Sequence, residues 1–412
     1  ASMRYLARAY LQQGQQETAL CWLHRAIAEA PHLREPYVDA ALLCYERGED
    51  EGVLYYTGRA LAILERPATY ICEAEAWGSL PHDLRAIAFY HTGRIPQALE
   101  AARAALERAG EYPDPLCRTL RQAIAARDGV QPEQVLCGNG AAEVIFRLAL
   151  ALRPRAALLT APTFAEYEGA LRQVGCDCRF HLLREDVQFD VTEEILGAIE
   201  APIELVVLCS PNNPTGRVIA PALLEKILAR CRVIGARLLL DECFLPLAQA
   251  GPGMAPYLAA WPELFLLRAF TKTYGLPALR LGYGLGEAAL VERMLAWGPC
   301  WNVSGPAQAA GLACCQLPQW PSDGRALAAS ERPQLLRGLA ALGCRVIPGG
   351  ANYLLFCLPG VFDLKERLLR QGVLLRSCAN YRGLGPDWYR VAVRQAAENE
   401  TLLRALGAAL ED

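Results

Sequence analysis

Four residues in the middle of the chain have types and spacing that could carry chemistry. Lys272 stands in Phe-Thr-Lys-Thr-Tyr, and Arg280 follows it by eight residues in Leu-Arg-Leu-Gly-Tyr. Asp241 follows an apolar run and opens Asp-Glu-Cys-Phe, and Asn213 lies upstream in Ser-Pro-Asn-Asn-Pro-Thr-Gly. A lysine amine condenses with aldehydes, an acid holds a ring nitrogen protonated, and an arginine fork matches a phosphate. The set therefore fits an aldehyde cofactor with a ring nitrogen and a phosphate, which is pyridoxal 5′-phosphate.

Each of these residues also has a purely structural interpretation. A lysine is commonly a solvated surface residue, although this chain has only a handful of them. Asp241 could cap a helix, Asn213 could belong to a plain Asn-Pro turn, and each arginine could hold a structural ion pair. Their occurrence together and in this order favours the cofactor.

The composition restricts the class of protein. The 412 residues are enough for two or three domains with their own cores. A net charge of −3 with 21% charged residues gives no basic stripe, which argues against nucleic acid as a partner. The apolar runs are broken by Arg, Glu or Pro before they reach the roughly 18–20 residues that span a bilayer. We therefore expect a cytoplasmic protein without a membrane span.

The cysteines do not form a recognisable metal or disulfide pattern. There are 16 of them, scattered along the chain, with no Cys-x-x-Cys motif and only five histidines. Zinc sites need closely spaced Cys and His ligands. We therefore predict no metal site, and we interpret the thiols as small buried apolar groups in a reducing compartment.

Helical repeats are predicted over residues 1–110. Gly14 and Gly48 are 34 residues apart, as are Ala26 and Ala60, and 34 is the period of the tetratricopeptide repeat. Small residues at these offsets let the two helices of a hairpin touch. A third copy fits Gly93, Ala98, Ala102 and Ala105.

The pattern of the sequence changes after residue 110. Over residues 111–304, short β-rich runs alternate with helical patterns, which predicts a mainly parallel sheet with helices on both faces. Residues 305–412 read as a linking helix followed by a small α+β domain. The predicted strands of the larger domain include Ala156–Leu159, Ile203–Leu208, Arg237–Leu240 and Leu264–Leu267.

Residues 112–412 resemble fold-type I pyridoxal-phosphate enzymes of the class I and II aminotransferase superfamily. The resemblance rests on the four motifs around Asn213, Asp241, Lys272 and Arg280. The nearest branches are threonine-phosphate decarboxylase, an enzyme of cobalamin biosynthesis, and histidinol-phosphate aminotransferase. The resemblance implies a seven-stranded sheet and a homodimer. The repeats in turn resemble those that follow some bacterial family-2 glycosyltransferases. They either present a surface to which a protein partner binds or form a helical appendage packed on the enzyme.

The resemblance assigns roles to individual residues. Lys272 and Asp241 are the catalytic pair, Asn213 bonds the phenolic oxygen of the cofactor, Arg280 binds its phosphate and Phe164 stacks on its ring. Gly138-Asn-Gly-Ala-Ala-Glu adds backbone N–H groups at a helix start, which is itself an anion site. Other expected contacts are Gly140, Ala141, Ala142 and Thr271 for the cofactor, Tyr112 for the cofactor of the other subunit, and Arg376, Arg390 and Asn352 for the substrate.

The chain also departs from the pattern of these families. Ala142 and Ala269 stand where relatives often carry a hydroxyl on the cofactor phosphate, and Phe244 replaces a tyrosine that many aminotransferases direct at the phenolic oxygen. Helical repeats replace the usual N-terminal arm upstream of Tyr112. Phosphate binding and stabilisation of the phenolate should both be weaker for these reasons.

Three functions follow as hypotheses. The first is decarboxylation of L-threonine O-3-phosphate to 1-aminopropan-2-yl phosphate and carbon dioxide, because the segments that begin at Arg376 and Arg390 resemble that branch. The second is transamination of histidinol phosphate. The third is a non-catalytic interaction protein, in which the repeats bind a partner and the cofactor domain is degenerate.

Overall fold

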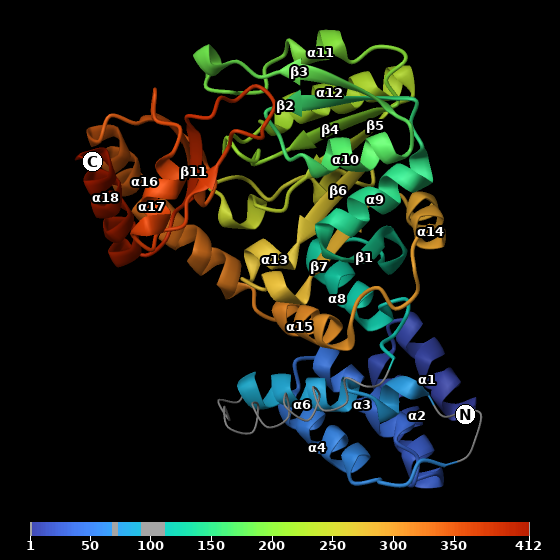
Figure 1. Ribbon diagram of the computed structural model, residues 1–412. Helices are drawn as coiled ribbons and strands as arrows, with labels where there is room; N and C mark the ends of the chain where they lie inside the picture. The colour runs from blue at the N-terminus through green and yellow to red at the C-terminus, as the bar shows by residue number, and fades with distance from the viewer. Residues whose placement is uncertain (1, 68–72, 92–111, 412) are drawn as a thin grey trace. The chain divides into compact units, whose positions relative to one another are not determined.

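The computed structural model describes residues 2–67, 73–91 and 112–411, and the chain divides into two compact units. One unit contains Ala1–Cys117 and Val303–Ala313. The other contains Arg118–Asn302 and Cys314–Asp412. Figure 1 shows the elements of each unit. The domain boundaries at residues 110 and 304 stay predictions.

Antiparallel helical hairpins build the first unit. Gly14 and Gly48 have φ angles of 73° and 70°, which glycine adopts at low cost, and each turns the chain between two helices. Ala7, Ala19 and Ala40 are fully buried where these helices meet. The predicted helical region is thus confirmed. The helices are α1 (Ser2–Gln12), α2 (Gln16–Glu29), α3 (Glu35–Glu46), α4 (Asp50–Leu61), α5 (Ala74–Trp77) and α6 (Leu80–His91).

The assignment of these hairpins to the tetratricopeptide family stays a prediction. The third copy, at Gly93, Ala98, Ala102 and Ala105, lies outside the described residues. The segment Val303–Ala313 belongs to this unit as well, and the Tyr45 hydroxyl donates a hydrogen bond of 3.3 Å to the carbonyl of Leu312.

A seven-stranded sheet is the centre of the second unit (Figure 1). Its strand order is β1-β7-β6-β5-β4-β2-β3, and β7 is antiparallel to both neighbours while the other pairs are parallel. The predicted mainly parallel sheet is confirmed. The strands are β1 (Val135–Asn139), β2 (Ala156–Ala161), β3 (Asp177–Leu182), β4 (Leu205–Cys209), β5 (Arg237–Asp241), β6 (Leu264–Ala269) and β7 (Leu281–Leu285).

Helices cover both faces of this sheet. Leu205, Val207 and Leu239 point from alternate strand positions into one core with α9, α10 and α14. On the other face α12 packs against β5. The α-helices are α8 (Arg118–Asp128), α9 (Gly140–Leu152), α10 (Glu166–Gln173), α11 (Ile195–Ala198), α12 (Pro221–Ile234), α13 (Phe270–Thr273) and α14 (Ala288–Ala296). The 3-10 helices are η1 (Pro132–Gln134), η2 (Glu185–Val187), η3 (Leu245–Leu247), η4 (Ala255–Tyr257) and η5 (Pro277–Leu279).

A smaller antiparallel sheet follows, in the order β10-β11-β9-β8. One of its faces buries Phe356 and Tyr389 against Leu335 and Leu406 of two flanking helices, which gives this part its own core. Its strands are β8 (Arg345–Ile347), β9 (Tyr353–Cys357), β10 (Arg376–Ser377) and β11 (Trp388–Ala392). The helices of the C-terminal third are α15 (Gly305–Cys315), α16 (Gln319–Ala341), α17 (Leu364–Arg370) and α18 (Ala396–Glu411).

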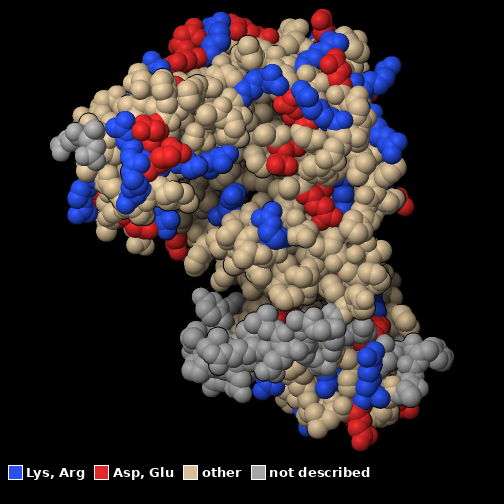
Figure 2. Space-filling view, in the orientation of Figure 1, with Lys and Arg blue, Asp and Glu red and all other residues tan. Residues whose placement is uncertain are grey.

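Charges of both signs are interspersed on the drawn face of the protein. Figure 2 shows that basic side chains also border the recess between the small sheet and the rest of the second unit. Across the described ranges, none of the helices is both long and apolar enough to cross a membrane.

A buried cluster of charged side chains connects β5 and β6, the strands that lead to Asp241 and Lys272. Arg268 of β6 bonds Glu242 at 2.7 Å and Asp128 at 3.3 Å, and all three side chains are at most 12% exposed. Arg127 pairs with Asp128 at 3.0 Å, and the Tyr283 hydroxyl donates to Asp128 at 2.9 Å. Glu242 directly follows Asp241, and Arg268 precedes Lys272 by four residues. The cluster therefore holds β5 and β6 in place next to Asp241 and Lys272, the predicted catalytic residues.

Replacing Arg268 with Met should lower the free energy of unfolding by about 3–5 kcal/mol, because the buried Glu242 loses the arginine that pairs with it and Asp128 keeps only Arg127. Urea unfolding followed by circular dichroism measures this loss. The matched control is Arg155→Met, which breaks an exposed pair with Glu204 and should cost at most about 1 kcal/mol. Equal losses in the two variants would contradict the structural role given to the cluster.

Candidate active site

The candidate site lies where three parallel strands end at the same edge of the large sheet. Asp241, the last residue of β5, pairs in register with Cys209 at the end of β4 and with Leu267 of β6. Lys272 follows β6 on the short helix α13, and the loop after β4 carries Asn213. Ligands of open α/β sheets bind beyond the carboxyl ends of their strands. The sheet topology thus brings together residues that are far apart in the sequence.

Asp241 is a buried carboxylate held by two donors. The Tyr167 hydroxyl donates to Oδ2 at 2.5 Å, and the Cys243 N–H donates to Oδ1 at 2.8 Å. Burial raises the pKa of Asp241, while hydrogen bonds from Cys243 and Tyr167 oppose that increase. Each carboxylate oxygen has a second lone pair. A cationic ring N–H can therefore bind the same carboxylate.

Lys272 lies beside this carboxylate. Its side chain is exposed as a whole, and its Nζ lies 5.7 Å from the centre of the Phe244 ring. Partial desolvation of the amine lowers the pKa of Lys272, the positive charges of Arg390 and Arg280 lower it further, and Asp241 acts against them. The chain contains three lysines, of which Lys226 is ion-paired with Glu193 at 2.5 Å. A lysine with a lowered pKa has more of the neutral amine that attacks an aldehyde.

Gly140 and Arg280 form a cradle at the start of α9. Gly140 has a φ of 80°, and a Cβ added there would lie 2.7 Å from Nη2 of Arg280. A Cβ on Gly282 would lie 2.3 Å from the backbone nitrogen of Ala141, so the strand and the helix start approach as closely as glycine allows. The first N–H groups of a helix have no partner inside the helix, and they bind anions. The arginine therefore lies against a ready phosphate site.

Two other residues that we expect to contact the cofactor lie on helices, Ala142 on α9 and Thr271 on α13. Ala142 belongs to the first turn of α9, and Thr271 is buried in α13, next to Lys272. Ala269 ends β6. Neither alanine offers a hydroxyl, so a phosphate bound here would take its hydrogen bonds from the backbone, Thr271 and Arg280.

Arg376 and Arg390 face each other on neighbouring strands. They are register partners in the antiparallel pair of β10 and β11. Like charges directly opposite each other repel, and the repulsion is relieved when an anion binds between them. Arg390 also lies 5.1 Å from the centre of the Tyr353 ring and donates a hydrogen bond to Oδ1 of Asn213. The pair therefore presents two cations beside the loop that carries Asn213.

Two amide groups complete the polar surface. Oδ1 of Asn213 accepts from the Tyr381 hydroxyl at 3.1 Å as well as from Arg390, so the NH₂ group is the part of this amide that can donate to a ligand. Oδ1 of Asn352 is buried and has no hydrogen-bond partner among the described residues. A buried acceptor without a partner is costly. A ligand that donates a hydrogen bond to this oxygen would remove that cost.

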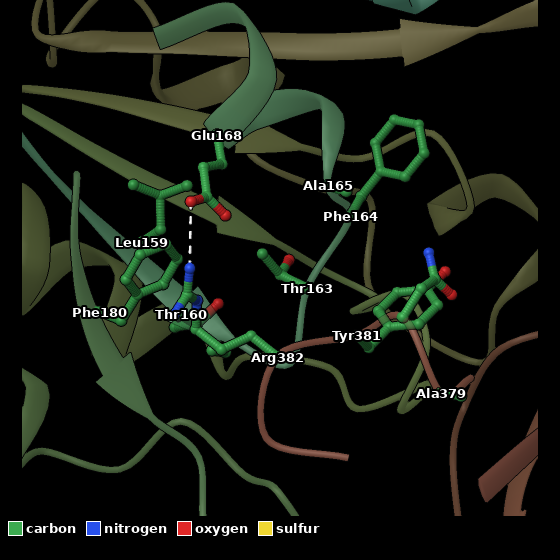
Figure 3. Close-up of a pocket in the computed structure, with 12 residues that line it drawn as sticks. Leu159, Thr160, Thr163, Phe164, Ala165, Glu168, Phe180, Ala379, Tyr381 and Arg382 are labelled. Carbon is green, nitrogen blue, oxygen red and sulfur yellow. Dashed lines mark hydrogen bonds and ion pairs between the residues drawn. The ribbon is translucent and has the colours of Figure 1, made fainter. Parts of the chain in front are cut away.

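Tyr381, whose hydroxyl bonds Asn213, also lines a pocket of about 320 Å³ (Figure 3). Phe164 and Tyr381 both line it, and the Phe164 ring meets the Tyr167 ring edge-on at 5.6 Å between centroids. On the other side Arg382 lies 3.1 Å from Glu168 and 4.0 Å from the centre of the Phe180 ring. Residues of the loop after β10 thus reach the large sheet at this pocket.

The structure brings most of the predicted site residues together in the second unit. Tyr112 belongs to the first unit and is 79% exposed, so its role toward another subunit stays a prediction. Sequence reasoning missed Tyr167 and Tyr381. Tyr167 lies on α10 and Phe164 in the loop before it, so no helical spacing links the two residues and no local signal identified Tyr167. Across the described ranges, no group of three or more His, Cys, Asp or Glu side chains could hold a metal ion.

Comparison with known proteins identifies a family for this fold and site. Residues 86–406 match the model for class I and II aminotransferases. The chain is 41% identical to threonine-phosphate decarboxylase of Salmonella typhimurium over 298 residues, which cover 72% of this chain and 82% of the relative. It is 37% identical to a histidinol-phosphate aminotransferase of Anaeromyxobacter sp. over 322 residues, which cover 76% and 87%.

Solved structures give the same result. The histidinol-phosphate aminotransferase of Clostridium acetobutylicum superposes with a TM-score of 0.71 at 25% identity, covering 76% of this chain and 95% of that one. L-threonine-O-3-phosphate decarboxylase of Porphyromonas gingivalis gives 0.68 at 25% identity, covering 76% and 94%. The chain therefore belongs to the class I and II aminotransferase family, whose enzymes, among them aminotransferases and decarboxylases, typically use pyridoxal 5′-phosphate.

Proposed function

We propose that this protein binds pyridoxal 5′-phosphate and decarboxylates L-threonine O-3-phosphate to 1-aminopropan-2-yl phosphate and carbon dioxide. The observation that carries the proposal is the register pairing of Arg376 with Arg390, next to Asn213 and Lys272. Two guanidinium groups suit a small substrate with a carboxylate and a phosphate. The similarity to threonine-phosphate decarboxylases supports the same substrate class.

The residues at the strand ends fit this cofactor. Asp241 is a buried acceptor for the ring nitrogen, the NH₂ group of Asn213 can donate to the phenolic oxygen, and Arg280 with the start of α9 suits the phosphate. Phe164 stacks on the ring in this proposal. When bound, the cofactor accepts the electron pair that is released as the substrate bond breaks.

The protein's own groups then bind and orient the substrate. Lys272 would hold the cofactor through its amine, and the same amine, once released, would move a proton at the substrate α-carbon. Arg390 binds the α-carboxylate and Arg376 the phosphate, while the amide of Asn352 supplies a further polar contact. Tyr112 completes the phosphate site of the partner in a homodimer. By fixing the α-carboxylate, Arg390 would set which substrate bond is positioned to break.

Transamination of histidinol phosphate is the second candidate, favoured by the 37% identity to an aminotransferase of that name. Histidinol phosphate carries one anionic group, whereas threonine phosphate carries two. A site with two opposed arginines therefore suits the latter better. A non-catalytic protein with a degenerate cofactor domain is the third candidate, which the two alanines near the phosphate favour.

Lys272→Ala should abolish covalent capture of pyridoxal phosphate. The purified parent should show a visible absorption band with the cofactor, and borohydride should fix the cofactor to a Lys272 peptide identified by mass spectrometry. Lys226→Ala is the matched control, because Lys226 lies in a surface ion pair, and it should keep the band. A parent protein without a band at saturating cofactor would refute the proposed function in favour of the third candidate.

Arg376→Gln should lower kcat/KM for L-threonine O-3-phosphate by about 10–100-fold, since a charge-assisted contact to the phosphate is lost. Release of carbon dioxide measures the rate. Arg370→Gln, an exposed arginine at the end of α17, should change it little. If histidinol phosphate reacts in a 2-oxoglutarate-dependent manner and threonine phosphate releases no carbon dioxide, the aminotransferase candidate is correct.

Arg390→Gln should raise the pKa of Lys272, because a positive charge that lowers this pKa is removed. The neutral amine then becomes abundant only at higher pH. The pH midpoint for the rate of pyridoxal-phosphate capture should accordingly move upward. Arg376→Gln is the control and should leave the midpoint in place. A downward or absent shift in Arg390→Gln would show that the two groups are not coupled.

A further inference from the structure

We propose that Tyr167 is the positioning residue that fixes the Asp241 carboxylate for the ring nitrogen of the cofactor. The inference rests on the proposed function, because it concerns the same site. It assigns a role to a residue of α10 that none of the four sequence motifs contains.

The geometry around the carboxylate is the first argument. Tyr167 is 1% exposed, and its hydroxyl donates to Oδ2 of Asp241 at 2.5 Å. The Cys243 N–H donates to Oδ1 at 2.8 Å. With one donor on each oxygen, the carboxylate cannot rotate without breaking a charge-assisted bond. The remaining lone pairs therefore keep one direction, which is what a fixed ring N–H requires.

The second argument is the contact of Tyr167 with Phe164. The two rings meet edge-on at an interplanar angle of 84°. Phe164 is the residue proposed to stack on the cofactor ring. One tyrosine thus touches both the group that holds the ring nitrogen and the group that holds the ring face. A shift of Tyr167 would misplace both together.

The third argument is electrostatic. Asp241 must be ionised to hold a protonated ring nitrogen, yet burial opposes the charge and raises its pKa. Donation from Tyr167 and Cys243 favours the anion. The nearby thiol of Cys209 does not assist the carboxylate in this way, because it donates to the carbonyl of Pro211 at 3.2 Å. The titratable groups that face Asp241 from the surrounding elements are Tyr167, Cys209, Cys243, Lys272 and Tyr353.

The test compares two cofactors on the full-length protein. Dissociation constants are measured for pyridoxal phosphate and for its 1-carba analogue, in which a CH group replaces the ring nitrogen. Tyr167→Phe should bind pyridoxal phosphate about ten-fold more weakly than the parent and should bind the analogue as the parent does. Tyr389→Phe is the matched control, because it removes a buried hydroxyl that donates to the Val361 carbonyl at 2.9 Å, far from Asp241 in the sequence.

The outcomes separate this inference from the proposed function. If the parent binds pyridoxal phosphate and Tyr167→Phe weakens both ligands equally, Tyr167 is a packing residue and the inference is wrong. A parent that binds neither ligand overturns the proposed function, and the inference with it. Selective loss of the natural cofactor supports the inference.

A second readout needs no cofactor. The folded pKa of Asp241 is raised, so the carboxylate lowers stability as pH rises from its unfolded pKa to its folded pKa. Loss of the Tyr167 hydroxyl raises the folded pKa further. The destabilisation of Tyr167→Phe should therefore grow with pH, whereas that of Tyr389→Phe should stay constant. A constant difference for Tyr167→Phe contradicts the inference.

A double variant covers the case in which Tyr167→Phe does not fold. Asp241→Asn removes the buried charge that the hydroxyl stabilises. If the coupling is real, the double variant Tyr167→Phe/Asp241→Asn should fold, because no anion is then left without its donor. Failure of this variant to fold, when Asp241→Asn alone folds, would overturn the inference.

Discussion

The pairing of Arg268 with two buried carboxylates is the interaction on which the candidate site depends. Arg268 holds Glu242, the residue after Asp241, and Asp128 at the end of α8. Buried ion pairs add little net stability, because desolvation offsets their attraction, but a broken pair is costly. Any displacement of β6 relative to β5 would break this one. Asp241 and Lys272 therefore keep a fixed mutual position even though Asp241 ends β5 and Lys272 follows β6 on α13.

The sequence predicted those parts of the fold that depend on local pattern. Buried strands such as β4 and β5 are continuous apolar runs. The motifs at the ends of β4, β5 and β6 carry Asn213, Asp241 and Lys272, in that order. The contacts made by Tyr167 and Tyr381 could not be predicted in this way. Tyr167 and Asp241 are 74 residues apart, and Tyr381 and Asn213 are 168 apart. Such contacts depend on strand order and on the placement of the small sheet, which no local spacing determines.

Phe244 has no hydroxyl, and a tyrosine hydroxyl elsewhere in the chain bonds Asn213 instead. The ring of Phe244 packs edge-on against Tyr353 at 4.9 Å between centroids. The hydroxyl of Tyr381 reaches Asn213 from the opposite side. Because Oδ1 of Asn213 is occupied by two donors, the orientation of its amide is set before any ligand arrives. An aromatic hydroxyl from the loop after β10 thus holds the Asn213 amide, whereas Phe244 offers no hydroxyl.

The scarcity of lysine gives the protein an unusual chemical character. Three of its 41 basic residues are lysines, and one of these is held by Glu193. Almost all surface ion pairs are made by guanidinium groups, which stay protonated and are poor partners for carbonyl compounds. A free aldehyde that meets this protein therefore finds few side-chain amines with which to react. Chemical selectivity for the amine beside Asp241 is in this sense a property of the whole surface as well as of the site.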